Sequence, residues 1–304
     1  MRVGNLLPLV AALPAAVTAR GNLGFSLGNK NPDSSCKETS DYKADFEALK
    51  SLTNVVRTYS ASNCHTAENI IPAAKDKGFK VVMAVWPDSD DAFQKDFDTL
   101  KKTIPGNEEV VHSITVGSET LYRGNLSAEK LLKRINQVKK QFPKIDVGTV
   151  ESWNKIADGT ANALIEGGVY YILANGFSYW QGTAINNSTD TYFNDMSQAL
   201  AHVKKLAGGN ADKVRFANGE TGWPGDGGTD YGAAKAGTDN AEQYYKTAVC
   251  GMLAWDIDVF YFEAFDESWK PDSIGDNGQP MDEGHWGMFT DNRKKKFDAS
   301  CPHN

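Results

Sequence analysis

Short apolar runs of β-type composition alternate along the chain with stretches whose apolar residues recur every three or four positions. The first pattern predicts buried strands, and the second predicts amphipathic helices, one of them capped by Ser127. We expect strands at residues 21–28, 55–61, 80–87, 111–119, 146–152, 170–180, 214–221 and 258–269. We expect helices at residues 42–52, 67–77, 92–104, 127–142, 154–166, 190–207 and 240–255.

This order of elements predicts an α/β fold, namely a (β/α)8 barrel of the TIM type in a single domain. Eight strands alternate with helices, and no Gly/Ser-rich linker interrupts the series. An open doubly wound sheet is the alternative fold, but no Gly-x-Gly-x-x-Gly motif follows the first strand. In a barrel of this kind the active site lies at the carboxyl ends of the strands.

The first 19 residues have the pattern of a secretory signal peptide. Arg2 supplies a positive charge, residues 6–16 are apolar, and Val17-Thr18-Ala19 is a small-residue cleavage site. We therefore expect a signal peptide at 1–19 and a barrel domain of 285 residues at 20–304. No stretch is apolar over the length of a membrane span, and the carboxyl end has no apolar tail for a lipid anchor. The chain is expected to be secreted, without a membrane anchor.

The charge balance is acidic. Without Arg2 the chain has 31 basic and 39 acidic residues, a net charge of −8, and no basic block. Such a chain is a poor partner for nucleic acid or for an anionic membrane surface. A neutral polysaccharide would be indifferent to this charge.

Four cysteines, an even number in an exported chain, predict disulfides. Three pairings are possible, and we favour Cys36–Cys64 and Cys250–Cys301. The spacing does not resemble a zinc site, and the five histidines form no ligand-spaced cluster. We expect neither a metal ion nor another cofactor.

Three asparagines begin Asn-x-Ser/Thr sequences and are candidate glycosylation sites: Asn125, Asn186 and Asn187. The last two sequons overlap and are expected to carry one glycan between them. These sequons agree with an exported protein.

Aromatic residues gather at the carboxyl ends of the predicted strands. They are Tyr59, Trp86, Trp153, Tyr179, Trp180, Trp223, Phe265 and Trp269. One interpretation is that they plug one end of the barrel. Because five of the seven tryptophans fall at this rim, we favour a groove in which flat rings contact sugars and polar groups bind hydroxyls.

Two glutamates stand where apolar runs end. Glu119 ends the run His-Ser-Ile-Thr-Val-Gly-Ser-Glu on the fourth strand, and Glu220 ends Val-Arg-Phe-Ala-Asn-Gly-Glu on the seventh. Taken singly, Glu119 has the alternative of a solvated loop or a pair with Arg123. Glu220 has the alternative of capping the turn at 219–228. Their joint placement favours a pair of catalytic carboxylates that cleaves a glycosidic bond by double displacement.

Double displacement gives the two carboxyl groups different tasks. One is protonated near neutral pH and donates to the leaving oxygen, whereas the other is ionised and attacks the anomeric carbon. We assign Glu119 as the acid/base and Glu220 as the nucleophile.

Three segments resemble glycoside hydrolase family 17. They are Val116-Gly117-Ser118-Glu119, Gly219-Glu220-Thr221-Gly222-Trp223-Pro224 and residues 262–270, Phe-Glu-Ala-Phe-Asp-Glu-Ser-Trp-Lys. Residues 283–289 fit the family's ending too, so the resemblance covers the whole mature chain. It is strongest to the fungal cell-wall branch of β-1,3-glucanases and β-1,3-glucanosyltransferases. The resemblance implies a β/α barrel, retention of anomeric configuration, cell-wall β-1,3-glucan as substrate, and the roles given above to the two glutamates.

The resemblance also implies residues around the cleavage subsite. Matching positions are Tyr59, Tyr179, Glu267 and Lys270, with Trp223 beside the nucleophile and Ser118 beside the acid/base. The alternative for Glu267 and Lys270 is a surface ion pair. Many relatives in the wider superfamily carry Asn where Ser118 stands, and a serine hydroxyl is shorter and offers one donor. A water or another residue is then expected to contact the 2-hydroxyl of the substrate, and because the fungal branch resembles this variant, activity is expected to be kept. Phe25 and Phe177 are expected to be packing residues.

Two other functions remain open. A non-catalytic carbohydrate-binding barrel would keep the aromatic rim without needing both glutamates. An inverting hydrolase would hold its carboxylates about 6.5–9.5 Å apart instead of about 5–5.5 Å. Between hydrolysis and transfer, an aromatic platform on the leaving-group side, at Trp153 or Tyr122, would favour transfer. We expect a monomer.

Overall fold

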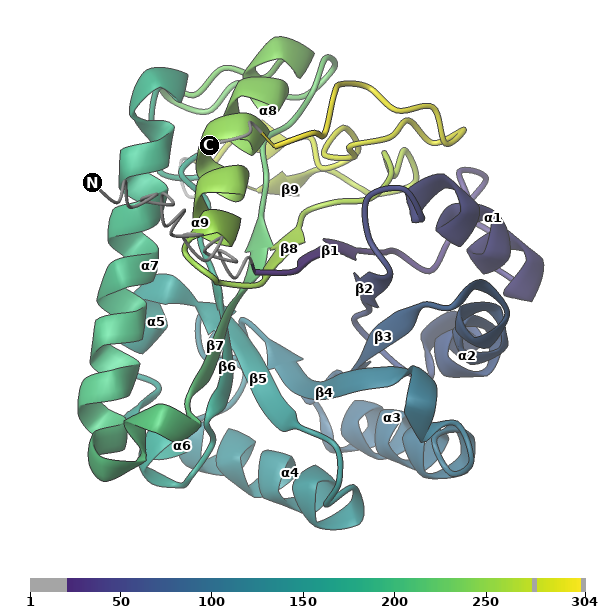
Figure 1. Cartoon of the computed structure of the whole chain (residues 1–304), viewed down its shortest axis with the longest axis vertical. Coiled ribbons are helices and arrows are strands. Elements are labelled where there is room, and N and C mark those ends of the chain that lie inside the picture. The colour runs from purple at the N-terminus through teal and green to yellow at the C-terminus, as the bar shows by residue number, and fades with distance from the viewer. Residues whose placement is uncertain (1–20, 275–277, 302–304) are drawn as a thin grey trace, which may run out of the picture.

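The computed structural model describes residues 21–274 and 278–301. In this part of the chain eight parallel strands close into a barrel in sequence order, and the last strand pairs with the first. The helices surround these strands (Figure 1). The predicted (β/α)8 fold class is therefore confirmed. The predicted signal peptide at 1–19 lies outside the described residues.

The barrel strands are β1 Leu23–Ser26, β2 Val55–Arg57, β3 Lys80–Val85, β4 Val111–Ser118, β5 Val147–Ser152, β6 Tyr171–Asn175, β7 Arg215–Thr221 and β8 Val259–Tyr261. The α-helices are α1 Thr39–Leu49, α2 Thr66–Lys77, α3 Asp90–Thr103, α4 Ala128–Gln141, α5 Trp153–Ala157, α6 Asn162–Glu166, α7 Ile185–Ala207, α8 Thr238–Tyr244 and α9 Cys250–Ala254. The other elements are the 3-10 helices η1 Asn63–His65, η2 Glu108–Val110 and η3 Gly208–Lys213, the π-helical turn η4 Tyr245–Val249, and the short strands β9 Ser273–Ile274 and β10 Pro280–Met281.

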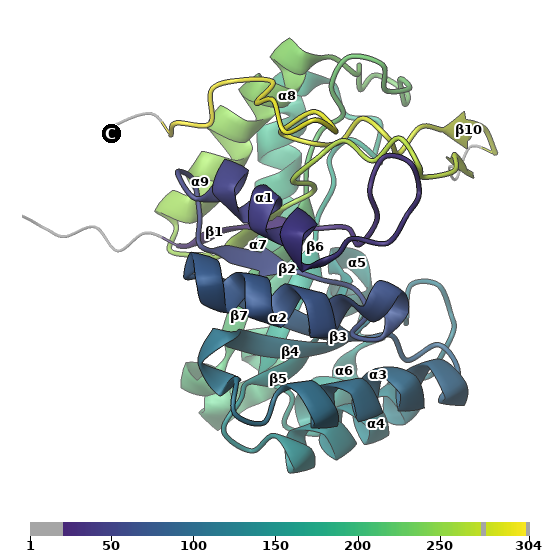
Figure 2. The ribbon, with the colours of Figure 1, turned by 90° about the vertical axis from the view of Figure 1, so that its right-hand side faces the viewer.

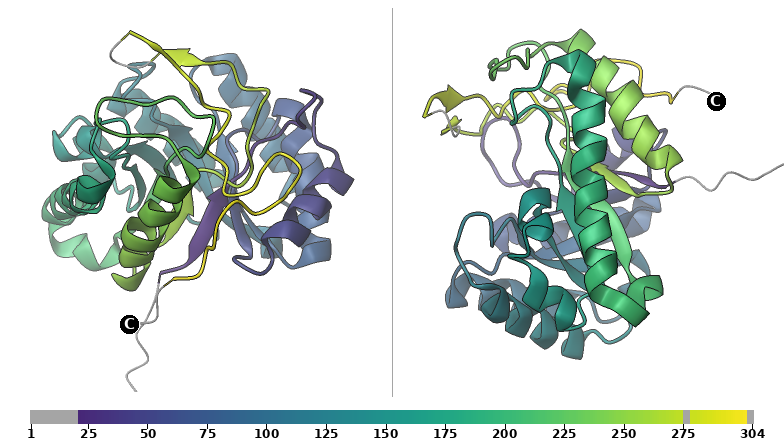
Figure 3. Two further views of the ribbon diagram at one scale, coloured as in Figure 1. Left: turned by 90° about the horizontal axis from the view of Figure 1, so that it is seen from above. Right: turned by 90° about the vertical axis from the view of Figure 1, so that its left-hand side faces the viewer.

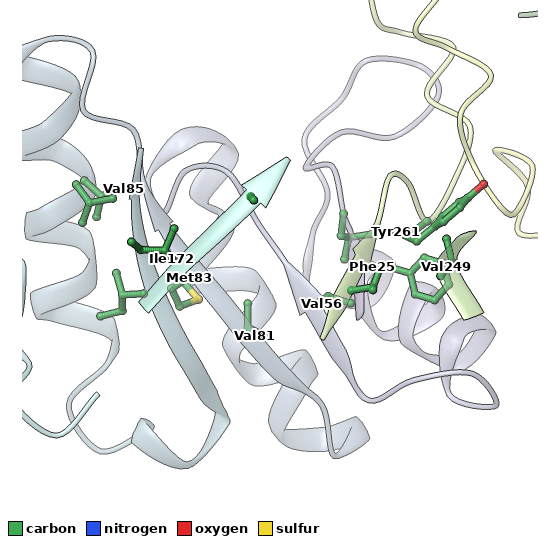
Figure 4. Packing of buried hydrophobic residues seen from close by; sticks show 14 of the residues in the cluster. Phe25, Val56, Val81, Met83, Val85, Ile172, Val249 and Tyr261 are labelled. Carbon is green, nitrogen blue, oxygen red and sulfur yellow. The ribbon is translucent and has the colours of Figure 1, made fainter. Parts of the chain in front are cut away.

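The apolar core has two parts, which follow from the alternation of side chains along a strand. Val81, Met83 and Val85 of β3 belong to a cluster that also contains helix residues (Figure 4). Val82, between them, belongs to a second cluster drawn from strand residues only. The first cluster therefore lies between the strands and the helices, and the second fills the barrel interior.

The predicted strands 170–180 and 258–269 are too long. The structure ends β6 at Asn175 and β8 at Tyr261. The apolar residues beyond these points lie in loops over the carboxyl ends of the strands. These loops pack on one another, so their side chains are buried without belonging to a strand.

Two predicted helices are divided. The stretch 154–166 forms α5 and α6, separated at Gly159, whose φ of 89° does not fit a helix. The stretch 240–255 forms α8, η4 and α9, which follow one another without a break. By contrast, α7 is a single helix of 23 residues along one side of the barrel (Figure 3). Among the described residues no helix has the length and apolarity to cross a membrane.

Both favoured disulfides are confirmed. Cys36 and Cys64 join the loop before α1 to η1, with Cα atoms 5.1 Å apart. Cys250, at the start of α9, is joined to Cys301 with Cα atoms 5.4 Å apart. The second bond fastens the last described residues to the outside of the barrel.

The segment after β8 completes the carboxyl-end face. Phe289 pairs in parallel with Phe265, and the backbone N–H of Glu263 donates to the carbonyl of Trp286. Between these two stretches β9 and β10 form an antiparallel pair that projects from the barrel (Figure 2).

Candidate active site

Glu119 and Glu220 lie at the carboxyl ends of β4 and β7, as predicted. Glu119 directly follows β4, and its backbone N–H donates to the carbonyl of Val150 at 3.0 Å. Its φ of 55° is in the left-handed region, which a non-glycine residue seldom adopts and which is costly. Both glutamates line one cavity of about 510 Å³, called here the glutamate cavity.

The rest of the glutamate cavity combines aromatic and polar side chains. Its lining includes Tyr122, Trp153, Phe177, Trp180 and Tyr231, together with Arg123, Asn154, Asn175, Gln181 and Glu283. Aromatic faces beside hydrogen-bonding groups are suited to a sugar, which presents flat apolar faces and a ring of hydroxyls.

Glu220 is held by a buried cation. Arg57, the last residue of β2, is fully buried and places Nη1 2.5 Å from Oε1 of Glu220. Its Nη2 donates to Oγ of Ser118 at 2.9 Å, and that hydroxyl lies 3.4 Å from the same carboxylate oxygen. A cation and a hydroxyl donor both stabilise the ionised carboxylate. Ser118 is thus bound within this network.

Glu119 has the opposite environment. Burial, reinforced by the negative charge of Glu220, raises the pKa of Glu119 to about 7. Asn175 at the end of β6 opposes this shift by donating from Nδ2 to Oε1 at 3.0 Å. At pH 7, therefore, about half of the Glu119 carboxyl groups still carry the proton that a general acid donates, while a buried cation lies against Glu220.

The contacts of both glutamates differ from their non-catalytic alternatives. Arg123 pairs with Asp88 at 3.4 Å and lies over the ring of Trp86. The described side-chain contacts of Glu220 are with Arg57 and Ser118. Among the described contacts, neither the alternative pair of Glu119 with Arg123 nor the alternative capping role of Glu220 is present.

A second cavity of about 550 Å³ is lined by Tyr59, Glu267 and Lys270, with Trp86, Phe262 and Trp269 among its other residues. Lys270 Nζ lies 2.9 Å from Glu267 and within 2.9 Å of both carboxylate oxygens of Glu263. The exposed fractions of the Lys270, Glu263 and Glu267 side chains are 15%, 2% and 5%. A surface ion pair is therefore the wrong interpretation, since this is a buried triad with two carboxylates and one ammonium.

Tyr59 lines the second cavity and contacts the cation that holds Glu220. It is half-buried in the second cavity, and the guanidinium of Arg57 lies 4.6 Å from the centre of its ring. Its hydroxyl is 3.5 Å from Nη1 of Arg57. Tyr59 therefore packs on the cation that holds Glu220.

Tyr179 and Trp223, predicted to contact the substrate, line neither the glutamate cavity nor the second cavity. Both side chains are buried: the Tyr179 hydroxyl donates to the carbonyl of Thr229, and Trp223 Nε1 donates to that of Lys235. Their rings pack edge to face, and Tyr179 packs also on Trp286. They support the cavity wall from behind.

Phe177 and Trp180 line the glutamate cavity, and Trp286 is buried behind them. Trp286 stacks on Trp180 with ring centres 5.3 Å apart and contacts Phe177 edge to face. Phe177, predicted to be a packing residue, is half-buried and also lines the glutamate cavity. Phe25 is fully buried, as expected for packing.

Sequence reasoning missed three residues of the site. Arg57 and Asn175 end β2 and β6, so the rule that identified the glutamates, polar residues at the carboxyl ends of strands, would have found them. Glu263 lies in the motif at 262–270 but was not singled out. No group of three or more His, Cys, Asp or Glu within 21–274 and 278–301 is arranged to hold a metal ion.

The three candidate glycosylation asparagines are exposed. Asn125 lies in the loop after β4, and Asn186 and Asn187 lie in the first turn of α7. Their glycosylation stays a prediction.

Comparison with known proteins gives consistent matches. The family model described as the BtgE/BtgC glycoside hydrolase domain matches residues 24–287. A glucan 1,3-beta-glucosidase of Arthroderma benhamiae is 58% identical over 303 residues, covering 99% of this chain and 98% of that protein. A glucan 1,3-beta-glucosidase of Saccharomyces cerevisiae is 40% identical, covering 94% of this chain and 93% of that protein.

Among solved structures, the chain is similar to a beta-1,3-glucanosyltransferase from Rhizomucor miehei, an active-site mutant in complex with laminaritriose. The TM-score is 0.78 and the identity 28%, covering 92% of this chain and 98% of that one.

Proposed function

This chain belongs to the BtgE/BtgC glycoside hydrolase family, and from that premise we propose that it cleaves internal β-1,3-glucosidic bonds with retention of configuration. It is an enzyme of a β-1,3-glucan-active family of hydrolases and glucanosyltransferases. The single observation that carries the proposed mechanism is the contrast between Glu119 and Glu220, which meet in one cavity with opposite electrostatic surroundings.

In the first step Glu220 attacks the anomeric carbon. The bond from that carbon to the bridging oxygen breaks, and Glu119 gives its proton to the departing oxygen. Arg57 and Ser118 hold the carboxylate of Glu220 in position before attack. The products are a glycosyl ester of Glu220 and a shortened glucan with a free hydroxyl.

In the second step Glu119, now ionised, removes a proton from the incoming hydroxyl. Attack of that oxygen on the anomeric carbon releases Glu220 and regenerates the acid. Water as acceptor gives hydrolysis, and a glucan hydroxyl gives transfer. Trp153 and Tyr122, which line the glutamate cavity, are the proposed aromatic platform for a glucan acceptor.

The biological setting is part of the same proposal. A secreted monomer with its catalytic domain at 20–304 remodels fungal cell-wall β-1,3-glucan without a cofactor. Tyr59, Glu267 and Lys270 bind the glucan in the second cavity.

The test follows the length of end-labelled laminari-oligosaccharides with the purified protein. Products longer than the substrate are expected, together with shorter ones. Both should disappear in Glu119→Gln and Glu220→Gln, and the first product anomer by NMR should be β. An α anomer would establish inversion. Absence of all products together with binding of the oligosaccharide would favour the non-catalytic barrel.

A second substrate separates the two roles. An aryl β-laminaribioside with a good leaving group needs little acid assistance. Glu119→Gln is therefore expected to release a burst of aryl alcohol equal to the enzyme concentration, and Glu220→Gln none. The reverse pattern would exchange the roles of the two residues.

A further inference from the structure

A third recess borders the glutamate cavity. It is open to solvent, has a volume of about 570 Å³, and lies against the first half of α7. Its residues are Trp153, Gln181, Thr183, Asp190, Thr191, Asn194, Asp195 and Gln198. It is called here the α7 recess.

The α7 recess adjoins the glutamate cavity, since Trp153 and Gln181 line both. Trp153 is half-buried, and the side chain of Gln181 reaches from the loop after β6 to Asp195 on α7. A chain leaving the glutamate cavity beside Trp153 therefore enters this recess.

Asp195 is the unusual residue in the recess. It is buried and stands on the core-facing stripe of α7, between Tyr192 and Ala199. Gln181 Nε2 donates to its Oδ2 at 2.6 Å, and among the described residues this is its one hydrogen bond, with no ion pair. A buried carboxylate normally accepts several hydrogen bonds or pairs with a cation. Burial raises the pKa of Asp195 to about 6.

The chemistry of the lining selects the ligand. The recess residues include two carboxylates and no Lys, Arg or His, which disfavours an anion. Amide, hydroxyl and carboxylate groups beside one indole are suited to a neutral polyhydroxylated chain, whose hydroxyls supply the donors that Asp195 lacks.

We propose that the α7 recess is an additional subsite for the β-1,3-glucan chain on the leaving-group side. Trp153 directs the chain out of the glutamate cavity, and Asn194, Asp195 and Gln198 bind its hydroxyls. The inference rests on the proposed function, in which Glu119 protonates the leaving oxygen. The glutamate cavity on the Glu119 side then holds the leaving group, and the recess holds its continuation. After departure of the leaving group, the same recess receives the acceptor.

The test measures transfer from a fixed donor to acceptors from laminaribiose to laminarihexaose. In the unmodified enzyme kcat/KM for transfer should rise with acceptor length. In Asn194→Ala/Gln198→Ala this rise should flatten, with a loss of about tenfold for the longest acceptor, since each lost hydrogen bond costs a few-fold. The matched control is Asn136→Ala/Gln137→Ala on the exposed face of α4, which lines no described cavity and should leave the length dependence unchanged.

Asp195→Asn distinguishes binding from a structural role. The amide keeps the shape of the carboxylate but removes a buried, sparsely bonded charge. The variant should resist thermal unfolding above about pH 6 at least as well as the unmodified protein, and still lose preference for long acceptors. If Asp195 had only a structural role, the preference for long acceptors would fall only together with thermal stability.

Calorimetric titration of Glu220→Gln with the same oligosaccharides repeats the test without turnover. If the unmodified enzyme makes no product, the proposed function fails, but affinity that rises with length and is lost in the recess variants still supports the subsite. Equal losses for every chain length, or no loss in either recess variant, would overturn the inference while leaving the proposed function intact.

Discussion

Replacing Glu119 with glutamine is expected to make the protein more stable at alkaline pH. In the folded protein burial and the charge of Glu220 raise the pKa of Glu119 from its ordinary value of 4.5 to about 7. In the unfolded chain the same group ionises near its ordinary value. Between these two pH values the unfolded state has lost its proton and the folded state still binds one. The free energy of unfolding therefore falls as pH rises through this window, and the loss is complete above pH 7.

The size of the effect follows from the same two values. One pKa unit corresponds to about 1.4 kcal/mol, so moving from 4.5 to about 7 costs the folded state about 3 kcal/mol at most. The amide of Glu119→Gln is uncharged, so its burial beside Glu220 lacks this unfavourable term. Relative to the unmodified protein, the variant should gain up to that amount above pH 7 and nothing on this account below about pH 4.5.

The assay is denaturant unfolding of both proteins at about pH 4.5 and about pH 8. Comparing the two pH values cancels any pH-independent effect of the amide on packing. Glu129→Gln is a suitable control because Glu129 is exposed on α4 and its pKa is lowered. If Glu119→Gln differed from the unmodified protein by the same free energy at both pH values, the assignment of a raised pKa would be refuted.

Two further predictions concern rate and stability. The kcat/KM for glucan cleavage should fall above about pH 7 as Glu119 loses its proton. Asn175→Ala should move this alkaline limb of the pH–rate profile to higher pH, because Asn175 stabilises the ionised form of Glu119. A limb that moved to lower pH would contradict this role of Asn175. Replacing both Cys250 and Cys301 with alanine should lower the free energy of unfolding by up to about 4 kcal/mol, because the disulfide closes a loop of 51 residues in the unfolded chain. The Tm in a thermal melt should fall with it, and an unchanged Tm would show that the bond does not stabilise the fold.

The barrel and its two glutamates were predictable because both depend on local patterns. Short apolar runs of β-type composition alternate along the chain with stretches of helical period, and Glu119 and Glu220 stand where the apolar runs of β4 and β7 end. In a parallel barrel all carboxyl ends meet at one face, so the position of each residue on its own strand is enough to bring them together.

The exposure of the rim aromatics was not predictable in the same way. Trp223 and Trp180 follow strand ends alike, yet Trp223 is buried behind Tyr179 while Trp180 lines the glutamate cavity. This difference depends on how the loops and Trp286 pack over the barrel, which no local pattern encodes. Ser118 is a similar case, because its partner Arg57 comes from another strand.

The pairing of β1 with β8 means that the barrel cannot close until most of the chain has been synthesised. One edge of β1 pairs with β2, but its other edge has no partner until β8 is synthesised more than two hundred residues later. Trp286, which supports the wall of the glutamate cavity, comes later still. A chain that is still being translated contains Glu119 and Glu220 before β8 is present to close the barrel that positions them. The order of synthesis therefore delays assembly of the active site until translation is nearly finished.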